Sequence, residues 1–332
     1  MEYRQVGTSP VKVTEVALGA WAIGGWLWGG TDETLAVAGI QTAVDLGMTT
    51  LDTAPMYGFG LSEEIVGRAI KGRRDKVQLL TKFGLRWDET QGTPYFDTQG
   101  PGGRPVKVYK WGGAKSVLGE CEASLRRLGT DVIDLYQHHW PDESTPIEET
   151  MDACTKLLKQ GKIRAIGVSN YTVEMMEAAR KVVPLASDQP PYSMLKREIE
   201  KDVVPWCVEH KVGLVVYSPL QNGILAGKIP VDRQFPKTDL RIWSPFYSPE
   251  NRKRILAFLD GLRPIAESHR ATVGQVVINW TIHRPGITAA LVGVRNPDQA
   301  RENAGAAAFK LTDIETQQVN AALDDLKLEM PK

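Results

Sequence analysis

The sequence predicts an α/β fold: a closed (β/α)8 TIM barrel with an N-terminal β-hairpin and long loops on its C-terminal face. Eight short apolar segments recur along the 332 residues, amphipathic helical patterns lie between most of them, and no Gly-x-Gly-x-x-Gly motif follows the first segment. Alternating strands and helices favour parallel strands joined by right-handed crossovers, and eight such units suggest a barrel. An open doubly wound sheet that bound a dinucleotide would normally carry the glycine motif after its first strand.

The predicted strands are short apolar runs, mostly rich in Val, Ile and Leu. They cover residues 16–18, 48–52, 77–82, 133–139, 163–168, 185–189, 212–217 and 289–292. Helical patterns cover residues 32–46, 62–70, 114–128, 147–160, 172–182 and 297–308, and a further helix lies near 253–269. Residues 3–6 and 11–13, on either side of a Gly-Thr-Ser-Pro segment, predict the leading hairpin.

Two intervals, 83–113 and 218–252, are too long for ordinary connections. Loops longer than about 12–15 residues are uncommon in compact domains and are usually functional. Both intervals follow predicted strands, so both should open on the C-terminal face, where barrel active sites lie. The chain has no linker or low-complexity tract, and we therefore predict one domain over residues 1–332.

The composition excludes several classes of function. Lys plus Arg and Asp plus Glu each number 40, so the formal charge is zero, which argues against a nucleic-acid partner. No uncharged apolar run reaches the roughly 18–20 residues that span a bilayer. Three isolated cysteines and the absence of a secretory leader predict a cytoplasmic location. No metal-binding motif is present, and the sequence does not determine the oligomeric state.

Four polar residues with complementary acid–base chemistry lie at or just after the ends of separate predicted strands: Asp52, Tyr57, Lys82 and His139. A phenol with an unperturbed pKa of about 10 is a poor acid at neutral pH. A nearby ammonium group would lower that pKa, a carboxylate would hold the ammonium in place, and an imidazole would orient a carbonyl. Each residue alone has an ordinary structural explanation, such as a cap, a surface charge or a rim side chain. Together the four supply what carbonyl reduction requires.

The strand pattern also distinguishes two adjacent histidines. Side chains alternate between the two faces of a strand, so His139 shares a face with Gln137 and Leu135, whereas His138 lies on the other face. We therefore predict that His139 belongs to the site and that His138 is structural.

At these residues the chain resembles the aldo-keto reductase family. The resemblance extends from about residue 16 to about residue 311, and includes a further set of motifs: Gly167-Val168-Ser169-Asn170, Tyr217-Ser218-Pro219-Leu220 and Glu302-Asn303. Gln189-Pro190-Pro191-Tyr192 is most similar to a bacterial branch that includes glycerol and polyol dehydrogenases. The resemblance implies reversible, NADP(H)-dependent reduction of aldehydes or ketones, including compounds derived from sugars or polyols.

The resemblance also implies a role for each acid–base residue. Tyr57 protonates the developing alkoxide, and Lys82 lowers the pKa of Tyr57. Asp52 fixes Lys82, and His139 binds the carbonyl oxygen. The expected partner is a small-molecule carbonyl compound.

The same resemblance implies a cofactor groove. Ser169, Asn170 and Gln189 hydrogen-bond the nicotinamide carboxamide, and Tyr217 stacks beneath the nicotinamide ring. The remaining candidates form the pyrophosphate loop (Ser218, Pro219, Leu220, Gly223 and Lys228), the 2′-phosphate site at a helix N-terminus (Gly293, Arg295 and Gln299, with Arg241 from the long loop) and the adenine site (Glu302 and Asn303). Some family members have a basic residue at the position of Gln299. With Arg295 nearby, we predict NADPH rather than NADH.

Tryptophans should form the substrate mouth. Trp21 and Trp140 match family pocket positions, whereas Trp280 is predicted to be ordinary core packing. Further indoles lie in the predicted loops: Trp26, Trp28, Trp87 and Trp111. Aromatic walls suit short aldehydes, ketoses or aryl aldehydes, and the sequence does not choose among them.

Two other functions stay open on the residues alone. One is a nucleotide-binding redox sensor or auxiliary subunit without catalysis. The other is a barrel lyase or isomerase that uses Lys82 as a Schiff base, although that mechanism would leave the motif residues Ser169, Gln189 and Tyr217 unexplained.

Overall fold

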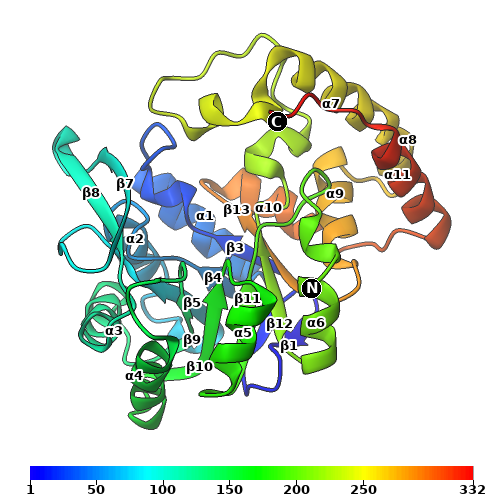
Figure 1. The fold of residues 1–332 in the computed structure, drawn as a ribbon. Helices are drawn as coiled ribbons and strands as arrows, with labels where there is room; N and C mark the ends of the chain where they lie inside the picture. Colours follow the sequence, from blue (N-terminus) through cyan, green and yellow to red (C-terminus); the bar gives the residue numbers. More distant parts are fainter. Residues whose placement is uncertain (332) are drawn as a thin grey trace.

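Eight parallel strands form a closed barrel at the centre of the computed structural model, which describes residues 1–331 (Figure 1). Going around the barrel, the strands are β3 (Val16–Gly19), β4 (Thr50–Asp52), β5 (Gln78–Phe83), β9 (Ile133–His138), β10 (Ile163–Ser169), β11 (Leu185–Gln189), β12 (Gly213–Tyr217) and β13 (Ile287–Gly293). The predicted barrel is confirmed, and every predicted strand boundary lies within two residues of the observed one.

Helices surround the barrel and connect successive strands. They are α1 (Glu33–Asp45), α2 (Leu61–Ala69), α3 (Ala114–Leu128), α4 (Ile147–Lys159), α5 (Val173–Arg180), α6 (Val203–His210), α7 (Pro249–Gly261), α8 (Arg263–Ser268), α9 (Val273–Ile282), α10 (Pro297–Gly305) and α11 (Asp313–Asp325). The single helix predicted near 253–269 is wrong, because α7 ends at Gly261 and α8 begins anew with Pro264 in its first turn. Proline lacks the backbone N–H that a continuous helix would need at that position.

The predicted N-terminal hairpin is present as β1 (Tyr3–Gln5) and β2 (Lys12–Thr14), which pair antiparallel. Val6, Val11 and Val13 are buried and pack with residues of the barrel interior such as Ala17 and Leu80. The hairpin therefore adds apolar residues to the interior cluster.

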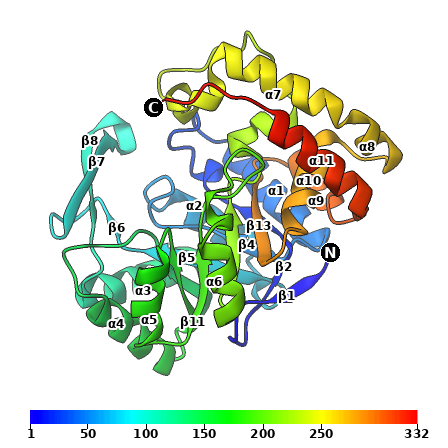
Figure 2. The same ribbon diagram turned by 45° about the vertical axis from the view of Figure 1, so that its right-hand side comes forward.

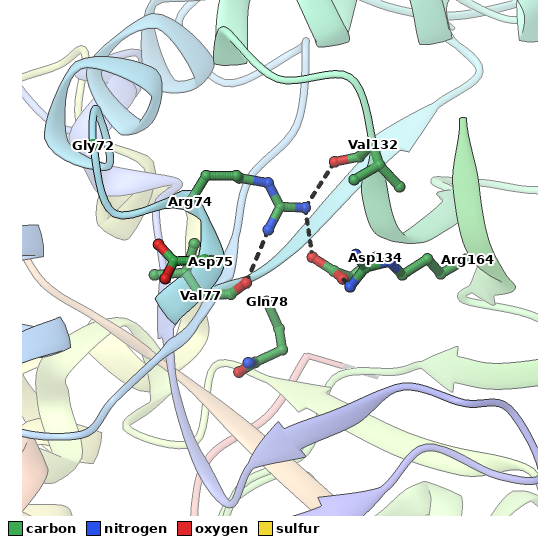
Figure 3. A pocket seen from close by; sticks show the side chains of 8 residues that line it. All are labelled: Gly72, Arg74, Asp75, Val77, Gln78, Val132, Asp134 and Arg164. Atoms are coloured by element: carbon green, nitrogen blue, oxygen red, sulfur yellow. Dashed lines mark hydrogen bonds and ion pairs between the residues drawn. The ribbon is translucent and has the colours of Figure 1, made fainter. Parts of the chain in front are cut away.

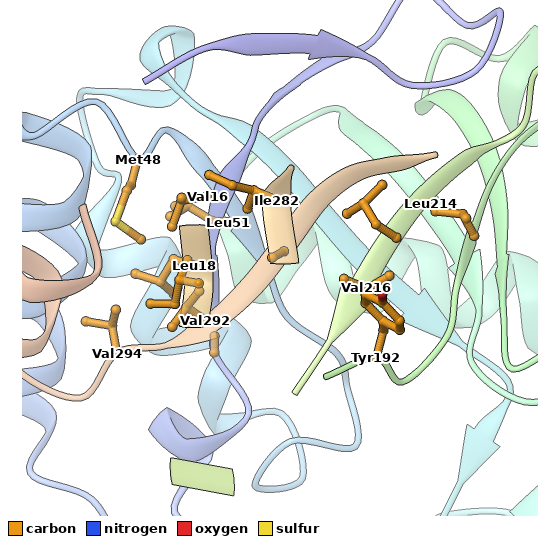
Figure 4. Packing of buried hydrophobic residues seen from close by; sticks show 14 of the residues in the cluster. Val16, Leu18, Met48, Leu51, Tyr192, Leu214, Val216, Ile282, Val292 and Val294 are labelled. Atoms are coloured by element: carbon orange, nitrogen blue, oxygen red, sulfur yellow. The ribbon is translucent and has the colours of Figure 1, made fainter. Parts of the chain in front are cut away.

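The main apolar core lies between the barrel and its helices. Val16, Leu18, Leu51 and Val292 belong to it and gather on neighbouring strands (Figure 4). The alternate residues of the strands face the barrel axis, so each strand is buried on both sides, as parallel barrels require. No helix among residues 1–331 has the length and apolarity to span a membrane.

At one edge of the barrel wall, the carboxylate of Asp134 connects three strands (Figure 3). Asp134 on β9 accepts hydrogen bonds from Arg74 Nη2 (2.7 Å), Arg164 Nη1 (2.7 Å) and the backbone N–H of Leu79 (2.8 Å). Both arginines that line this surface hollow are thus paired with one carboxylate, which indicates a structural role.

The first long interval is not a loop, and this prediction was wrong. It folds into a three-stranded antiparallel sheet of β6 (Leu85–Arg86), β7 (Thr93–Gln99) and β8 (Pro105–Lys110). In Figures 1 and 2 the β7–β8 hairpin extends from one side of the barrel, while α7 and α11 lie on the other. The tight turn at Gly100-Pro101-Gly102-Gly103 connects the two long strands.

The second long interval contains three short 3-10 helices: η5 (Gln221–Ala226), η6 (Leu240–Trp243) and η7 (Pro245–Tyr247). The backbone N–H of Leu240 donates to the carbonyl of Leu27 (3.1 Å), so this interval is joined to the loop that follows β3.

Candidate active site

Asp52 and Lys82 form a buried ion pair at the C-terminal ends of β4 and β5. Lys82 Nζ donates to Asp52 Oδ1 (2.5 Å) and to the carbonyl of Thr53 (3.0 Å), and neither side chain exposes more than 2% of its surface. The ammonium lies 4.9 Å from the centroid of the Tyr57 ring. Three of the four predicted acid–base residues are therefore adjacent.

The pKa of Tyr57 differs from the prediction, and the pKa of Lys82 is shifted as well. Burial, followed by the charge of Asp52, raises the pKa of Tyr57 well above its ordinary value, and burial lowers the pKa of Lys82. The net shift of the Tyr57 pKa is thus opposite in direction to the predicted one, and the lowering effect of Lys82 itself stays a prediction. The physical reason is that Lys82 is paired with Asp52 and faces the ring of Tyr57, so burial and the carboxylate dominate. Tyr57 is a neutral phenol at neutral pH, and it carries the proton that a general acid must donate.

The two histidines lie where the strand pattern predicts. The His139 ring packs edge-on against Tyr57, with centroids 5.7 Å apart, and both residues line the same cavity. His138 points away, stacks on Phe83 and has its Nδ1 2.7 Å from the Tyr171 hydroxyl. Burial, together with the nearby charge of Lys82, lowers the pKa of His139 well below its usual range, so the imidazole is neutral at neutral pH.

One cavity of about 740 Å³ connects the predicted residues. Of all the predicted catalytic, cofactor and substrate residues, only Lys82 does not line it, since Lys82 lies behind Asp52 and Tyr57. The cavity extends from Tyr57 and His139 to Arg295 and Glu302 at the start of α10. Acid–base side chains in one part and Arg295 in another suit a ligand that carries both a reactive ring and a phosphate-bearing group.

The comparisons with known proteins bear on this arrangement. The family model described as "Aldo/keto reductase family" matches residues 15–324. The chain belongs to the aldo/keto reductase family. Members of this family are oxidoreductases that use nicotinamide cofactors.

Three similar proteins show the range of the family. The structure of the glycerol dehydrogenase AKR11B4 from Gluconobacter oxydans is 38% identical, with a TM-score of 0.88, and the match covers 99% of this chain and 97% of that one. The structure of an aldo/keto reductase from Klebsiella pneumoniae in complex with NADP and acetate is 29% identical, with a TM-score of 0.72 and coverage of 97% and 95%. The NADH-specific methylglyoxal reductase of Escherichia coli is 34% identical over 93% of this chain and 94% of its own.

At the end of the cavity beside the acid–base residues, this aldo/keto reductase presents a linked set of polar groups. Tyr217 Oη donates to Asn170 Oδ1 (2.9 Å), and Asn170 Nδ2 donates to the His139 carbonyl (3.1 Å). Ser169 Oγ donates to the backbone carbonyl of Gln189 (2.7 Å). These bonds fix the side chains in place, and the set of amides and hydroxyls fits a carboxamide ligand.

At the other end, each of the predicted cationic groups has a protein partner. Arg241 forms a two-point pair with Asp239 (2.8 and 2.5 Å). Arg295 Nη2 donates to the carbonyl of Gly30 (2.5 Å), so it joins α10 to the loop after β3. A further ion pair, between Lys228 and Glu302 (2.5 Å), joins the pyrophosphate loop to α10. The fit of a phosphate here rests on the positive charge and on the N-terminus of α10.

The mouth of the cavity contains aromatic residues that sequence reasoning missed. Phe96 on β7 stacks on Trp26, with centroids 6.0 Å apart, and Tyr95 lies 5.5 Å from Trp140. Trp26 Nε1 donates to Thr98 Oγ1 (3.1 Å), which latches the hairpin to the loop after β3. The adjacent aromatic residues Tyr95 and Phe96, followed by the Gly-Pro-Gly-Gly segment, were the signal for this hairpin.

The other tryptophans have ordinary roles. Trp87 packs against Phe59, with centroids 5.5 Å apart, and Trp111 lies next to Arg86 outside the cavity. Trp280 is buried and stacks on Tyr192, as predicted. Within residues 1–331, no three His, Cys, Asp or Glu side chains are grouped as a metal site would require.

Proposed function

We propose that the protein reduces aldehydes or ketones to alcohols with NADPH, and that the reaction is reversible. The observation that carries this proposal is the placement of Tyr57 and His139 side by side in one cavity, with the Lys82–Asp52 pair buried behind them. A neutral phenol can donate a proton to the carbonyl oxygen during reduction, and a neutral imidazole can donate a hydrogen bond to the same oxygen.

Each side chain then has a defined task. A bound reduced nicotinamide supplies the hydride. The neutral imidazole of His139 donates a hydrogen bond to the carbonyl oxygen and orients it. Tyr57 transfers its proton to the oxygen as negative charge develops there. The phenolate that remains lies beside the ammonium of Lys82, which stabilises it, and Asp52 keeps Lys82 in position. In the reverse direction the phenolate accepts the alcohol proton.

Arg295 and Arg241 support NADPH over NADH. Both line the cavity near the N-terminus of α10, where an adenosine 2′-phosphate would find positive charge. The Klebsiella neighbour was solved with NADP, whereas the E. coli relative is named NADH-specific, so both cofactors occur among similar proteins. We propose that these two arginines make this protein bind NADPH more tightly than NADH.

Short carbonyl compounds, including those derived from polyols or sugars, are the proposed substrates. The glycerol dehydrogenase neighbour points in this direction. The barrel strands and the segments inserted between them line one cavity together, which supports a single catalytic domain. Three buried, unpaired cysteines suit a reducing cytoplasm.

The direct test is to mix the purified protein with NADPH and a panel of aldehydes and ketones, and to follow the loss of reduced-nicotinamide absorbance. We expect turnover with glyceraldehyde and with aryl aldehydes, and slower turnover with NADH. Binding of NADPH without turnover of any carbonyl would instead support a redox sensor. Absence of NADPH binding would contradict the proposed function.

A further inference from the structure

We infer that Gln137 is a positioning residue that fixes the side-chain amide of Gln189, so that Gln189 turns its carbonyl oxygen toward the nicotinamide carboxamide. Gln137 lies on β9, two residues before His139, and its side chain is fully buried. The inference rests on the proposed binding of a nicotinamide cofactor beside Gln189. It adds a residue that none of the predicted motifs contains.

The carboxylate of Asp52 determines how two amides are oriented. Its Oδ1 accepts from Lys82 Nζ, while its Oδ2 accepts from Gln189 Nε2 (2.9 Å) and from Gln137 Nε2 (3.3 Å). An ionised carboxylate only accepts hydrogen bonds. Each amide must therefore face Asp52 with its NH2 group, which leaves its carbonyl oxygen directed elsewhere.

A third contact completes the network. Gln189 Nε2 also donates to Gln137 Oε1 (3.1 Å), so the two hydrogens of the Gln189 amide have two acceptors, Asp52 and Gln137. Since Gln189 lines the cavity, its Oε1 is the atom that remains to meet a ligand. An acceptor at this point selects a donor, which is the NH2 group of a nicotinamide carboxamide.

The neighbouring strands make room for Gln137. In the barrel register Gln137 lies beside Lys82 on β5 and Gly167 on β10. A Cβ atom at residue 167 would lie 2.4 Å from Ser187 Oγ and 3.0 Å from Gln137 Cγ, closer than ordinary side-chain contacts, so the glycine leaves space for both side chains. The first residue of the Gly-Val-Ser-Asn motif thus supports the same amide network as the residues that face the cofactor.

The size of the effect follows from counting hydrogen bonds. Turning the Gln189 amide by half a turn costs two hydrogen bonds when Gln137 is present, but only one when residue 137 has no acceptor. One such bond corresponds to roughly a fivefold change in an equilibrium constant. Without Gln137, Gln189 should more readily present its NH2 group to a ligand that carries only acceptors.

Two oxidised cofactors that differ in one group test this inference. NADP+ has a carboxamide, whereas nicotinic acid adenine dinucleotide phosphate has a carboxylate, which only accepts. We expect wild-type protein to bind NADP+ more tightly than the acid analogue, as measured by quenching of tryptophan fluorescence. In Gln137→Met, the ratio of the two dissociation constants should fall about fivefold. Adenosine 2′,5′-bisphosphate, which lacks the nicotinamide, should bind both proteins equally.

Control variants separate positioning from general damage. Tyr136→Phe removes a buried hydrogen bond to the Val117 carbonyl (3.2 Å) from the same strand, on its other face, and should leave the ratio unchanged. Gln137→Asn keeps a polar amide in the barrel but withdraws it from Gln189, so it should fold and behave like Gln137→Met. A wild-type ratio in both position-137 variants would overturn the inference, as would a parallel loss of bisphosphate binding. Failure of wild-type protein to bind NADP+ would instead contradict the proposed function.

Discussion

The strand ends and the mouth of this reductase are built in different ways. Asp52, Lys82, Gln137 and Gln189 lie on strands of the closed barrel, are almost fully buried, and contact one another across the barrel axis. The mouth is formed by loops and by a hairpin that are held together by aromatic contacts and single hydrogen bonds, such as that from Trp26 to Thr98. This difference implies that the strand ends determine whether the reaction proceeds, whereas the mouth determines which molecules it accepts.

The largest expected effect is at the strand ends. Tyr57→Phe removes the proton donor and should lower turnover by about 10²–10⁴-fold for every carbonyl substrate alike. NADPH affinity should stay near the wild-type value, because the ring and its packing remain. Steady-state rates and fluorescence titration measure the two quantities. Retention of more than a few per cent of wild-type turnover would show that Tyr57 is not the acid. It would also contradict the claim that the strand ends determine whether the reaction proceeds.

A smaller and more selective effect is expected where the loops meet α10. Arg295→Ala should weaken NADPH roughly ten- to a hundredfold if the guanidinium contacts the 2′-phosphate, and NADH little. High salt should weaken NADPH more than NADH, because an exposed phosphate contact is screened. Because Arg295 also donates to the Gly30 carbonyl, equal losses for both cofactors would mean that the arginine serves mainly to hold the loop.

The mouth should change preference without changing chemistry. Phe96→Ala removes the ring that stacks on Trp26, and should lower kcat/KM for aryl aldehydes about tenfold relative to glyceraldehyde. Thr98→Val keeps the shape of the side chain but removes the acceptor for Trp26 Nε1, and should give a weaker shift in the same direction. If kcat/KM fell equally for both substrates in Phe96→Ala, the hairpin would affect the reaction itself, as the strand ends do, and not the choice of substrate.

A substitution at Asp188, on the outward face of a strand end, should change stability and leave turnover nearly unchanged. Burial raises the pKa of Asp188, the neighbour of Gln189, to about 8. An acid whose pKa is raised on folding favours the folded state fully only below its unfolded pKa of about 4, and that contribution is lost as the pH rises toward 8. Asp188→Asn should therefore unfold at a higher temperature than wild type at pH 8, with a smaller difference at pH 5. An equal difference at both pH values would contradict the linkage.

The two regions also differ in how much the sequence reveals. Barrel strands are short apolar runs, and the alternation of their side chains places His139 and Gln137 on one face, yet it does not show that Gln137 contacts Asp52 and Gln189. The β7–β8 hairpin was missed because Gly and Pro dominated the interval, and its strands are held partly by Trp26, far away in sequence. The net shift of the Tyr57 pKa runs opposite to the predicted direction, since burial in the folded chain and the charge of Asp52 both raise it.

The central claim is that Tyr217 lies beneath the nicotinamide, so that the ring delivers its hydride from the opposite face to a carbonyl held by Tyr57 and His139. Incubating the protein and an aldehyde with NADPH deuterated stereospecifically at C4 tests this claim most directly, with mass spectrometry of the alcohol. We predict that the label at the pro-R position appears in the product and that the pro-S label stays on the cofactor. Transfer of the pro-S label, or a product alcohol without either label, would contradict the account.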